Sequence, residues 1–298
     1  MKALLDSGIL GVIILAMLSV GLELEFRYFR ALAQHSVALM AMLLMQIVLL
    51  PAIALLISYA LDLSPILRSG ILLIAACPVG DMASFFTLIG RGNVAISVMM
   101  NAISCLISPI SMAMIFTGYS HILATRFEFA APGWGLVLRF FFLITVPMIA
   151  GIALRHARIA KIDLISRFLR FVCLLGVLAL SVYVMASRFE QLKSDWRFAV
   201  TASARLALAA MTIGWTASRV LRVQRADSLA FLISFAVRNV GLAATIAITI
   251  MNRIEYAVFS TVYFLSEVVL VLAVVIAFRL WVAKIRGGTL DNGTTTKL

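Results

Sequence analysis

The sequence predicts an all-α polytopic membrane protein, and two observations lead to that prediction. Hydrophobic residues make up 63% of the chain and charged residues only 13%, with a mean hydropathy of +1.10, whereas soluble domains run near 45–50% apolar and about 25% charged. Apolar stretches of about 20 residues, the length that crosses the hydrocarbon core as a helix, also recur along the chain. The net charge of +12 comes from Lys and Arg in short loops, which favours a role in membrane topology over nucleic-acid binding.

Nine apolar spans follow one another with short connections. The first runs on without an A-x-A-like cleavage site, so we expect a retained helix and not a signal peptide. Residues 1–286 are predicted to form a single transmembrane domain, and the polar, glycine- and threonine-rich tail 287–298 is predicted to be disordered. The spans are predicted near residues 4–24, 37–59, 67–89, 94–117, 135–154, 168–187, 198–218, 228–250 and 256–281.

The basic residues predict how these spans are oriented. Cytoplasmic loops retain Lys and Arg, and the densest basic clusters, at 155–170 and 219–225, fall in the same set of alternate loops. We therefore expect the N-terminus outside and the C-terminus in the cytoplasm, in the cell (inner) membrane. Spans 3 and 8 then run in opposite directions, as in an inverted repeat. Residues 4–117 would form one repeat, 168–281 the other, and 135–154 the connecting helix.

Two spans carry helix-breaking and ionisable residues near their middle. Unwound backbone survives at membrane depth only where it is buried in protein or lines a wet cavity. Interrupted helices in corresponding positions of two halves point to a transporter's binding site. We therefore expect the two discontinuous helices to cross and to form a polar site. The residues at the breaks are Pro78, Gly80 and Asp81 in the third span, and Arg238, Asn239 and Gly241 in the eighth.

The ionisable residues at the breaks have two interpretations. Arg238 is predicted to hold an anionic substrate group in a bidentate manner, with Asp81 as its counter-charge or as a proton carrier. Alternatively, the two form a structural ion pair, since buried charges in membranes usually pair. Glu267 in the last span is either a second coupling site or a residue bonded to a neighbouring helix. The substrate-binding candidates are Arg238, Asn239, Asp81, Ser84 and Asn101, and the ion-coupling candidates are Asp81, Gln46, Ser84, Ser97, Asn101, Ser234 and Glu267.

The sequence disfavours enzymatic, metal and cofactor chemistry. The motifs HExxH, GxSxG, P-loop and GxGxxG do not occur, and the three histidines fall in separate loops. Cys77, Cys105 and Cys173 lie inside apolar spans at spacings that match no metal or redox motif, so we interpret them as small buried hydrophobic residues. No cofactor is expected apart from Na⁺ or H⁺ as a coupling ion.

Four blocks resemble the bile acid:sodium symporter family, in the family's order. They are MLSVGLELEFRYFRAL, QIVLLP, AACPVGDMASFFTLIGRGNVAISV followed by ISCLISP, and SFAVRNVGLA. This resemblance implies a panel of spans packed on a core of crossing broken helices, and transport of an organic anion by alternating access. It also implies a nine-span form without the extra N-terminal helix of some members.

The chain departs from the family pattern at the residues that would bind sodium. Gln46 and Ser97 match the family's sodium ligands, but a hard cation needs several oxygen ligands. We hypothesise that Arg238 takes the sodium position and that Asp81 offsets it, so that transport is proton-coupled or uncoupled. The departures are Ala83 and Ser84 for a Ser-Asn pair, Asn101 for a Thr, Ser234 for a Glu and Arg238 for a Gln.

Three other functions stay open at this point. Sodium symport could be retained through Gln46, Ser84, Ser97 and Asn101 together with backbone carbonyls. An efflux carrier related to arsenite and auxin-type exporters is the second alternative, and a non-transporting membrane sensor is the third, which the lack of a soluble output domain disfavours. The identity of the organic anion, the direction of transport and the oligomeric state do not follow from the sequence.

Overall fold

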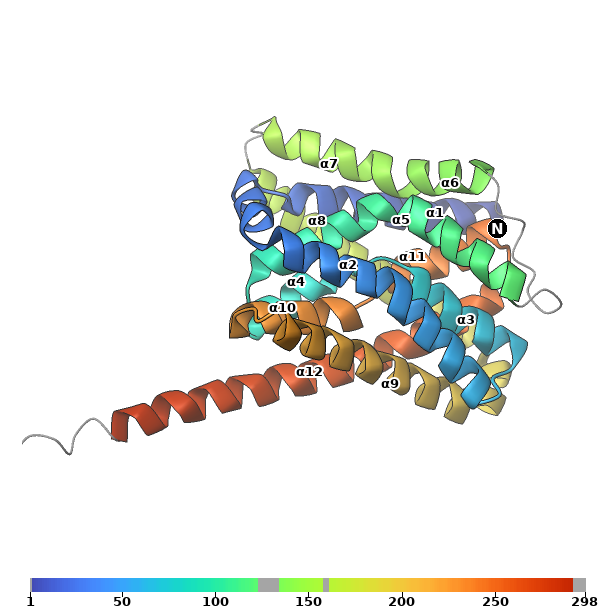
Figure 1. Ribbon diagram of the computed structural model, residues 1–298. Coiled ribbons are helices and arrows are strands. Elements are labelled where there is room, and N and C mark those ends of the chain that lie inside the picture. The colour runs from blue at the N-terminus through green and yellow to red at the C-terminus, as the bar shows by residue number, and fades with distance from the viewer. Residues whose placement is uncertain (1, 123–133, 158–160, 292–298) are drawn as a thin grey trace, which may run out of the picture.

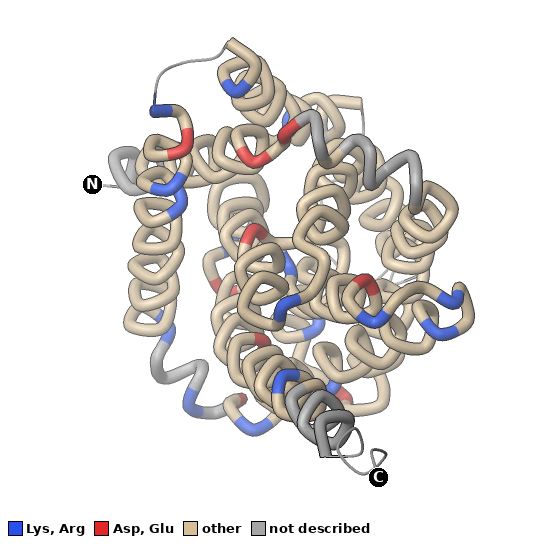
Figure 2. Tube along the Cα trace, turned by 90° about the vertical axis from the view of Figure 1, so that its left-hand side faces the viewer, with Lys and Arg blue, Asp and Glu red and all other residues tan. Residues whose placement is uncertain are grey.

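The computed structural model describes residues 2–122, 134–157 and 161–291. Within these ranges the secondary structure is helical apart from one isolated β-bridge, which confirms the all-α class (Figure 1). Long uncharged stretches separate the Lys, Arg, Asp and Glu residues (Figure 2). The chain is a multi-pass integral membrane protein. Six described helices are long and apolar enough to cross a membrane: His35–Ala60, Val94–His121, Val137–His156, Ile162–Ser187, Asp195–Val220 and Ile254–Val282.

The first half of the chain contains five helices. The second of them begins at Phe26, ahead of the predicted span 37–59, and bends where His35 leaves helical backbone angles (φ −120°, ψ 19°). The predicted third span is divided into two helices, as its proline and glycine led us to expect. These helices are α1 Lys2–Glu23, α2 Phe26–Ala60, α3 Pro65–Ala76, α4 Met82–Ile89 and α5 Val94–Ile122.

The described part of the second half contains seven α-helices and two π-helical turns. The turn Phe141–Thr145 joins the first two short helices, and the turn Ile246–Ile250 extends α11. The helices are α6 Trp134–Phe140, α7 Val146–His156, α8 Ile162–Ser187, α9 Phe189–Val220, α10 Arg225–Ala236, α11 Val240–Thr245 and α12 Ile254–Asp291.

The last helix extends into the predicted tail. Helix α12 continues to Asp291 and so includes the first residues of the segment 287–298 that was predicted to be disordered. An existing helix lengthens at low cost because each added residue gains a hydrogen bond without a new nucleus. Residues 292–298 of the predicted tail lie outside the described ranges.

The helices form two groups. Helices α1, α6, α7 and α8 form what we call the panel, in which α1 contacts α7 and α8, and α6 and α7 lie along one side of the molecule (Figure 1). The remaining helices form the core.

Helices α1 and α7 cross closely at two glycines. A Cβ on Gly21 would lie 2.1 Å from the Met148 carbonyl oxygen, and a Cβ on Gly151 would lie 2.2 Å from the Leu18 carbonyl oxygen. The two backbones therefore touch where both residues are glycine.

Candidate functional site

The two helix breaks lie against each other in the middle of the core. Val79 and Arg238 form an antiparallel β-bridge, in which the Gly80 N–H donates to the Val237 carbonyl and the Asn239 N–H donates to the Pro78 carbonyl, each at 3.0 Å. The unwound backbone of each break therefore supplies hydrogen-bond partners to the other, as burial away from water requires. A Cβ on Gly80 would lie 2.6 Å from the Arg238 carbonyl oxygen, so glycine permits this approach.

Gly241 was predicted at the second break, and that placement is wrong. Helix α10 ends at Ala236 and α11 begins at Val240, so Gly241 is already helical. The Asn239 carboxamide oxygen caps α11 by accepting from the Leu242 N–H at 2.9 Å, which lets the helix start directly after the bridge. Gly241 instead makes room for α8, since a Cβ there would lie 2.9 Å from Val177 Cγ2.

Arg238 is buried at the crossing with part of its guanidinium unpaired. The residue is 5% exposed. Its Nη2 donates to the Ala75 carbonyl at 3.1 Å, and its backbone N–H donates to Glu267 Oε2 at 3.1 Å. Nε and Nη1 are buried without a hydrogen-bond partner, as is the Asn239 Nδ2. Because buried polar groups are almost always paired, these three nitrogens mark a place where a further acceptor is expected.

Asp81 and Arg238 form no ion pair with each other in the described structure. The Asp81 carboxylate instead accepts from the Asn101 side-chain amide at 3.3 Å, and the guanidinium is held by the Ala75 carbonyl. The alternative of a structural Asp81–Arg238 cross-link is therefore absent from this conformation. Both residues line the same cavity, at separate points of its wall.

Three of the ion-coupling candidates form a second cluster. The Gln46 side-chain amide donates to the Ser234 carbonyl at 3.3 Å, and the hydroxyls of Ser97 and Ser234 lie 3.3 Å apart. All three are at most 3% exposed. Gln46 and Arg238 line a small cavity of about 20 Å³. Gln46 and Arg238 are therefore neighbours around one small space.

A larger cavity of about 440 Å³ is lined by residues of both the panel and the core. Its panel wall comes from α1 and α8 and is mostly apolar. Its core wall comes from the starts of α4 and α11 and from α12. Ligand cavities of this size, apolar with a few convergent polar groups, are typical of small-molecule sites. Of the predicted site residues, the cavity is lined by Gly80, Asp81, Ser84, Arg238, Asn239, Gly241 and Glu267, and the lining does not include Pro78, Gln46, Ser97, Asn101 or Ser234.

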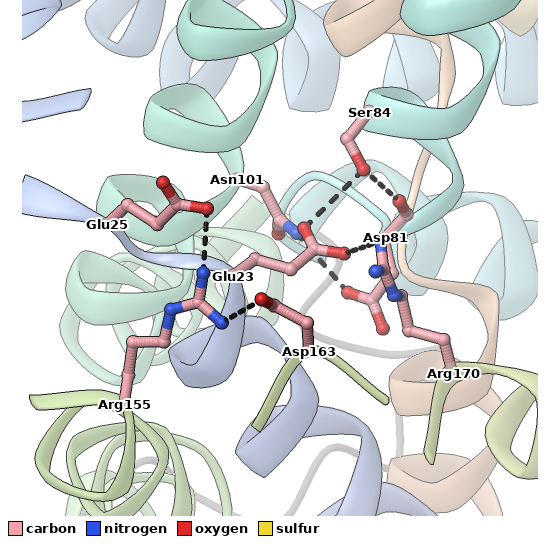
Figure 3. Close-up of polar contacts among 8 residues, drawn as sticks. All are labelled: Glu23, Glu25, Asp81, Ser84, Asn101, Arg155, Asp163 and Arg170. Atoms are coloured by element: carbon pink, nitrogen blue, oxygen red, sulfur yellow. Dashed lines mark hydrogen bonds and ion pairs between the residues drawn. The ribbon is translucent and has the colours of Figure 1, made fainter. Parts of the chain in front are cut away.

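Sequence reasoning missed a charged pair at one end of this cavity. Arg170 on α8 forms an ion pair with Glu23 on α1 at 2.7 Å. Glu23 Oε2 lies 3.5 Å from the Ser84 hydroxyl, which donates to the Asp81 carbonyl at 3.0 Å (Figure 3). Polar contacts therefore run from the panel to the first break. Arg170 had been interpreted only as a topology marker because it lies in a basic cluster at a span end, and nothing local distinguishes it from its neighbours.

A second charged group lies beside this pair. Arg155 of α7 pairs with both Glu25 and Asp163, and the Arg155–Glu25 distance is 2.7 Å (Figure 3). Arg155 thus joins α7 to the residues that follow α1 and begin α8. These contacts lie within the panel and its edge, whereas the Glu23–Arg170 pair faces Ser84 of the core.

The model of the sodium bile acid symporter family matches residues 10–195, which is more than half of the 298 residues. The chain belongs to the sodium bile acid symporter family. The resemblance found in the sequence motifs is thereby confirmed.

Relatives in this family come from plants and bacteria. A probable chloroplastic sodium/metabolite cotransporter BASS1 of Arabidopsis thaliana is 27% identical over 78% of this chain and 57% of its own length. The chloroplastic BASS2 of Oryza sativa subsp. japonica is 29% identical over 78% and 54%. The uncharacterized sodium-dependent transporter YocS of Bacillus subtilis (strain 168) is 22% identical over 86% and 78%. The chain spans about half the length of the two plant relatives.

Proposed function

We propose that this protein is a secondary transporter that carries a small organic anion by alternating access, with the sodium coupling of its family altered or lost. The observation that supports this most is Arg238. Arg238, whose buried guanidinium has two unpaired nitrogens, lies at the crossing of two broken helices and lines a cavity of about 440 Å³. A carboxylate or sulfate would supply an acceptor for a charged nitrogen that is otherwise buried without a partner.

The cavity walls favour an anion with an apolar body. Asn239 adds a further unpaired donor beside Arg238, so the polar end of the ligand would lie at the second break. Ile13, Leu174 and Phe264 are among the apolar side chains of the remaining wall. Such a wall stabilises an apolar body by roughly 25 cal/mol per Å² removed from water.

The charges around the cavity favour a coupled proton. Three arginines and two acids line the described wall, and a third acid, Glu23, pairs with Arg170. With all six groups ionised their sum is zero, so an entering anion would add an uncompensated charge in a poorly solvated space, which is costly. A proton on Asp81 would remove that cost. The lining charges are Arg167, Arg170, Arg238, Asp81 and Glu267.

A retained sodium site is the second candidate for coupling. The printed names of the plant relatives and of YocS include sodium, and Gln46, Ser97 and Asn101 are buried near the crossing. Against it, Ser234 lacks the carboxylate of the family pattern and a fixed cation borders the Gln46 space. An exporting direction of transport is a further variant of the same function, which uptake into oriented vesicles distinguishes.

Nine spans and an inverted repeat are proposed on the basis of element boundaries. Adding 160 to each residue number of α3, Pro65–Ala76, gives the bounds of α10, Arg225–Ala236. The same offset relates the end of α2 to the end of α9, and the start of α5 to the start of α12. Helices α3 and α10 lie at opposite ends of the core (Figure 1).

The same regularity supports the predicted division into repeats around 4–117 and 168–281, with a connecting helix around 135–154, all in one transmembrane domain. We propose that the connecting helix is the α6–α7 span and that the end bearing the basic clusters is cytoplasmic, which leaves the N-terminus outside.

Thermal unfolding of the purified protein tests the proposed function. A ligand that binds only the folded state stabilises it by RT ln(1 + [L]/Kd). We expect at least one amphipathic organic anion to raise the melting temperature equally in sodium and in potassium chloride. Stabilisation confined to sodium would overturn the altered coupling, and no stabilisation by any anion of the panel would argue against an organic anion substrate.

A further inference from the structure

A second cavity lies on the core, away from the panel. It has a volume of about 400 Å³ and is formed by the end of α9, by α10 and by α12. None of its lining residues belongs to the cavity at the helix breaks. It is therefore a separate groove that the proposed transport function does not use.

The rim of this groove consists of two arginine–tryptophan pairs. The Arg219 guanidinium carbon lies 5.3 Å from the centre of the Trp215 ring, and that of Arg225 lies 4.8 Å from the centre of the Trp281 ring. Trp215 is 46% exposed and Trp281 is 42% exposed. Each cation is thus held over an aromatic face, and the described lining of the groove contains no acidic residue.

The floor of the groove is apolar and runs from the rim along the helices. On α10 it includes Leu229 and Leu232, and on α12 it includes Val274 and Phe278. Arg225 and Leu232 are seven residues apart, which corresponds to about 10 Å at 1.5 Å per residue. The groove therefore has a positively charged, aromatic end and an apolar trough about two helical turns long.

We propose that this groove binds one anionic phospholipid. Its phosphodiester would lie between Arg219 and Arg225, and one acyl chain would follow the trough past Leu232. The charge complementarity favours a negatively charged headgroup, since basic pockets between membrane helices bind such headgroups. The trough favours a lipid over a free phosphate ion, because a free ion would leave the apolar floor without an occupant. Tryptophan rings at the ends of spans are typical of the headgroup level of a bilayer.

The test uses the full chain in detergent, titrated with phosphatidylglycerol, with phosphatidylcholine or with inorganic phosphate, and compared by native mass spectrometry and thermal unfolding. We expect one retained phosphatidylglycerol per chain and a higher melting temperature with that lipid than with phosphatidylcholine. The double variant Arg219→Gln/Arg225→Gln should weaken binding about fivefold per arginine removed. Arg222→Gln is the matched control, because Arg222 is exposed in the same loop and does not line the groove.

Each outcome decides the proposal. Loss of lipid in the double variant with retention in Arg222→Gln supports a defined lipid site. Equal loss in both would mean that general surface charge holds the lipid, and equal stabilisation by inorganic phosphate would mean a free-anion site. Either result overturns the proposal. The unfolding temperature of the double variant without lipid shows whether it is folded. In the wild type, quenching of Trp281 fluorescence by brominated lipid provides a further readout of lipid contact at this residue.

Discussion

Replacing Arg238 with glutamine should separate substrate binding from folding. The guanidinium donates through Nη2 to the Ala75 carbonyl and leaves Nε and Nη1 buried and unpaired. The backbone N–H of residue 238 donates to Glu267, and the substitution does not change this hydrogen bond. The bridge to Val79 is also made by backbone atoms. The break should therefore keep its geometry while it loses its positive charge.

The size of the effect follows from those two unpaired nitrogens. Hydrogen bonds to a charged group contribute about 1.5–3 kcal/mol each, so an anion that accepts two such bonds from the guanidinium would gain roughly 3–6 kcal/mol from Arg238. A glutamine amide could replace one of them with a neutral bond of about 1 kcal/mol. The expected loss is about 2–5 kcal/mol, which is roughly 30- to 4,000-fold in affinity.

The assay is the dependence of the melting temperature on anion concentration, from which a dissociation constant is obtained. Arg222→Gln is the control, because it makes the same chemical change at an exposed loop position in the same half of the chain. The control should bind as the wild type does. If Arg238→Gln binds the anion within about threefold of the wild type, a difference of about 0.7 kcal/mol, Arg238 does not contact the substrate and the proposed site is wrong.

Three further predictions test coupling and packing. Asp81→Asn should abolish proton uptake on anion binding, measured in weakly buffered solution; uptake equal to that of the wild type would exclude Asp81 as the carrier. Ser234→Glu/Arg238→Gln, which restores the family pattern at both positions, should gain stabilisation by sodium over potassium, and no gain would mean that other residues block the site. Gly21→Ala should destabilise the fold by about 1–3 kcal/mol, because its Cβ would meet the α7 backbone. The control Gly11→Ala has open space around it and should stay within about 1 kcal/mol of wild type. Equal unfolding free energies for the two variants would refute the close crossing.

The crossing of the two breaks was predictable because its signal is local. Proline, glycine and charged residues inside apolar spans cannot be accommodated in a lipid-facing helix, so Pro78 and Arg238 mark the site whatever the rest of the fold. Their corresponding positions in the two halves of the chain then predicted that the two breaks lie together. The prediction for Gly241 was wrong because glycine is tolerated in a helix, and its small size is needed there for contact with Val177.

The contacts made by the charged side chains could not be predicted in the same way. Which residue Asp81 faces depends on the rotation of α4 against α5, and that rotation is set by packing along both helices. The structure places Asn101 next to Asp81, and not Arg238. Glu23 and Arg170 are far apart in the sequence, and each lies at a span end where charged residues are common. Only the packing of α1 on α8 makes them a pair.

A fixed cation cannot perform all that a transported sodium ion does, and this limits the mechanisms open to the protein. An arginine at the crossing can neutralise a bound anion, but it is not transported with the anion. It therefore cannot couple transport to an ion gradient. Any coupling must then come from a group that gains and loses charge in each transport cycle.

Around the described cavity the side chains able to do so are the acids Asp81, Glu267 and Glu23. Glu267 is tied to the Arg238 backbone and Glu23 to Arg170, whereas Asp81 has only an amide partner. If the Arg238 substitution has removed sodium coupling, the protein is either a uniporter or a proton symporter that uses Asp81, and proton uptake on anion binding distinguishes the two.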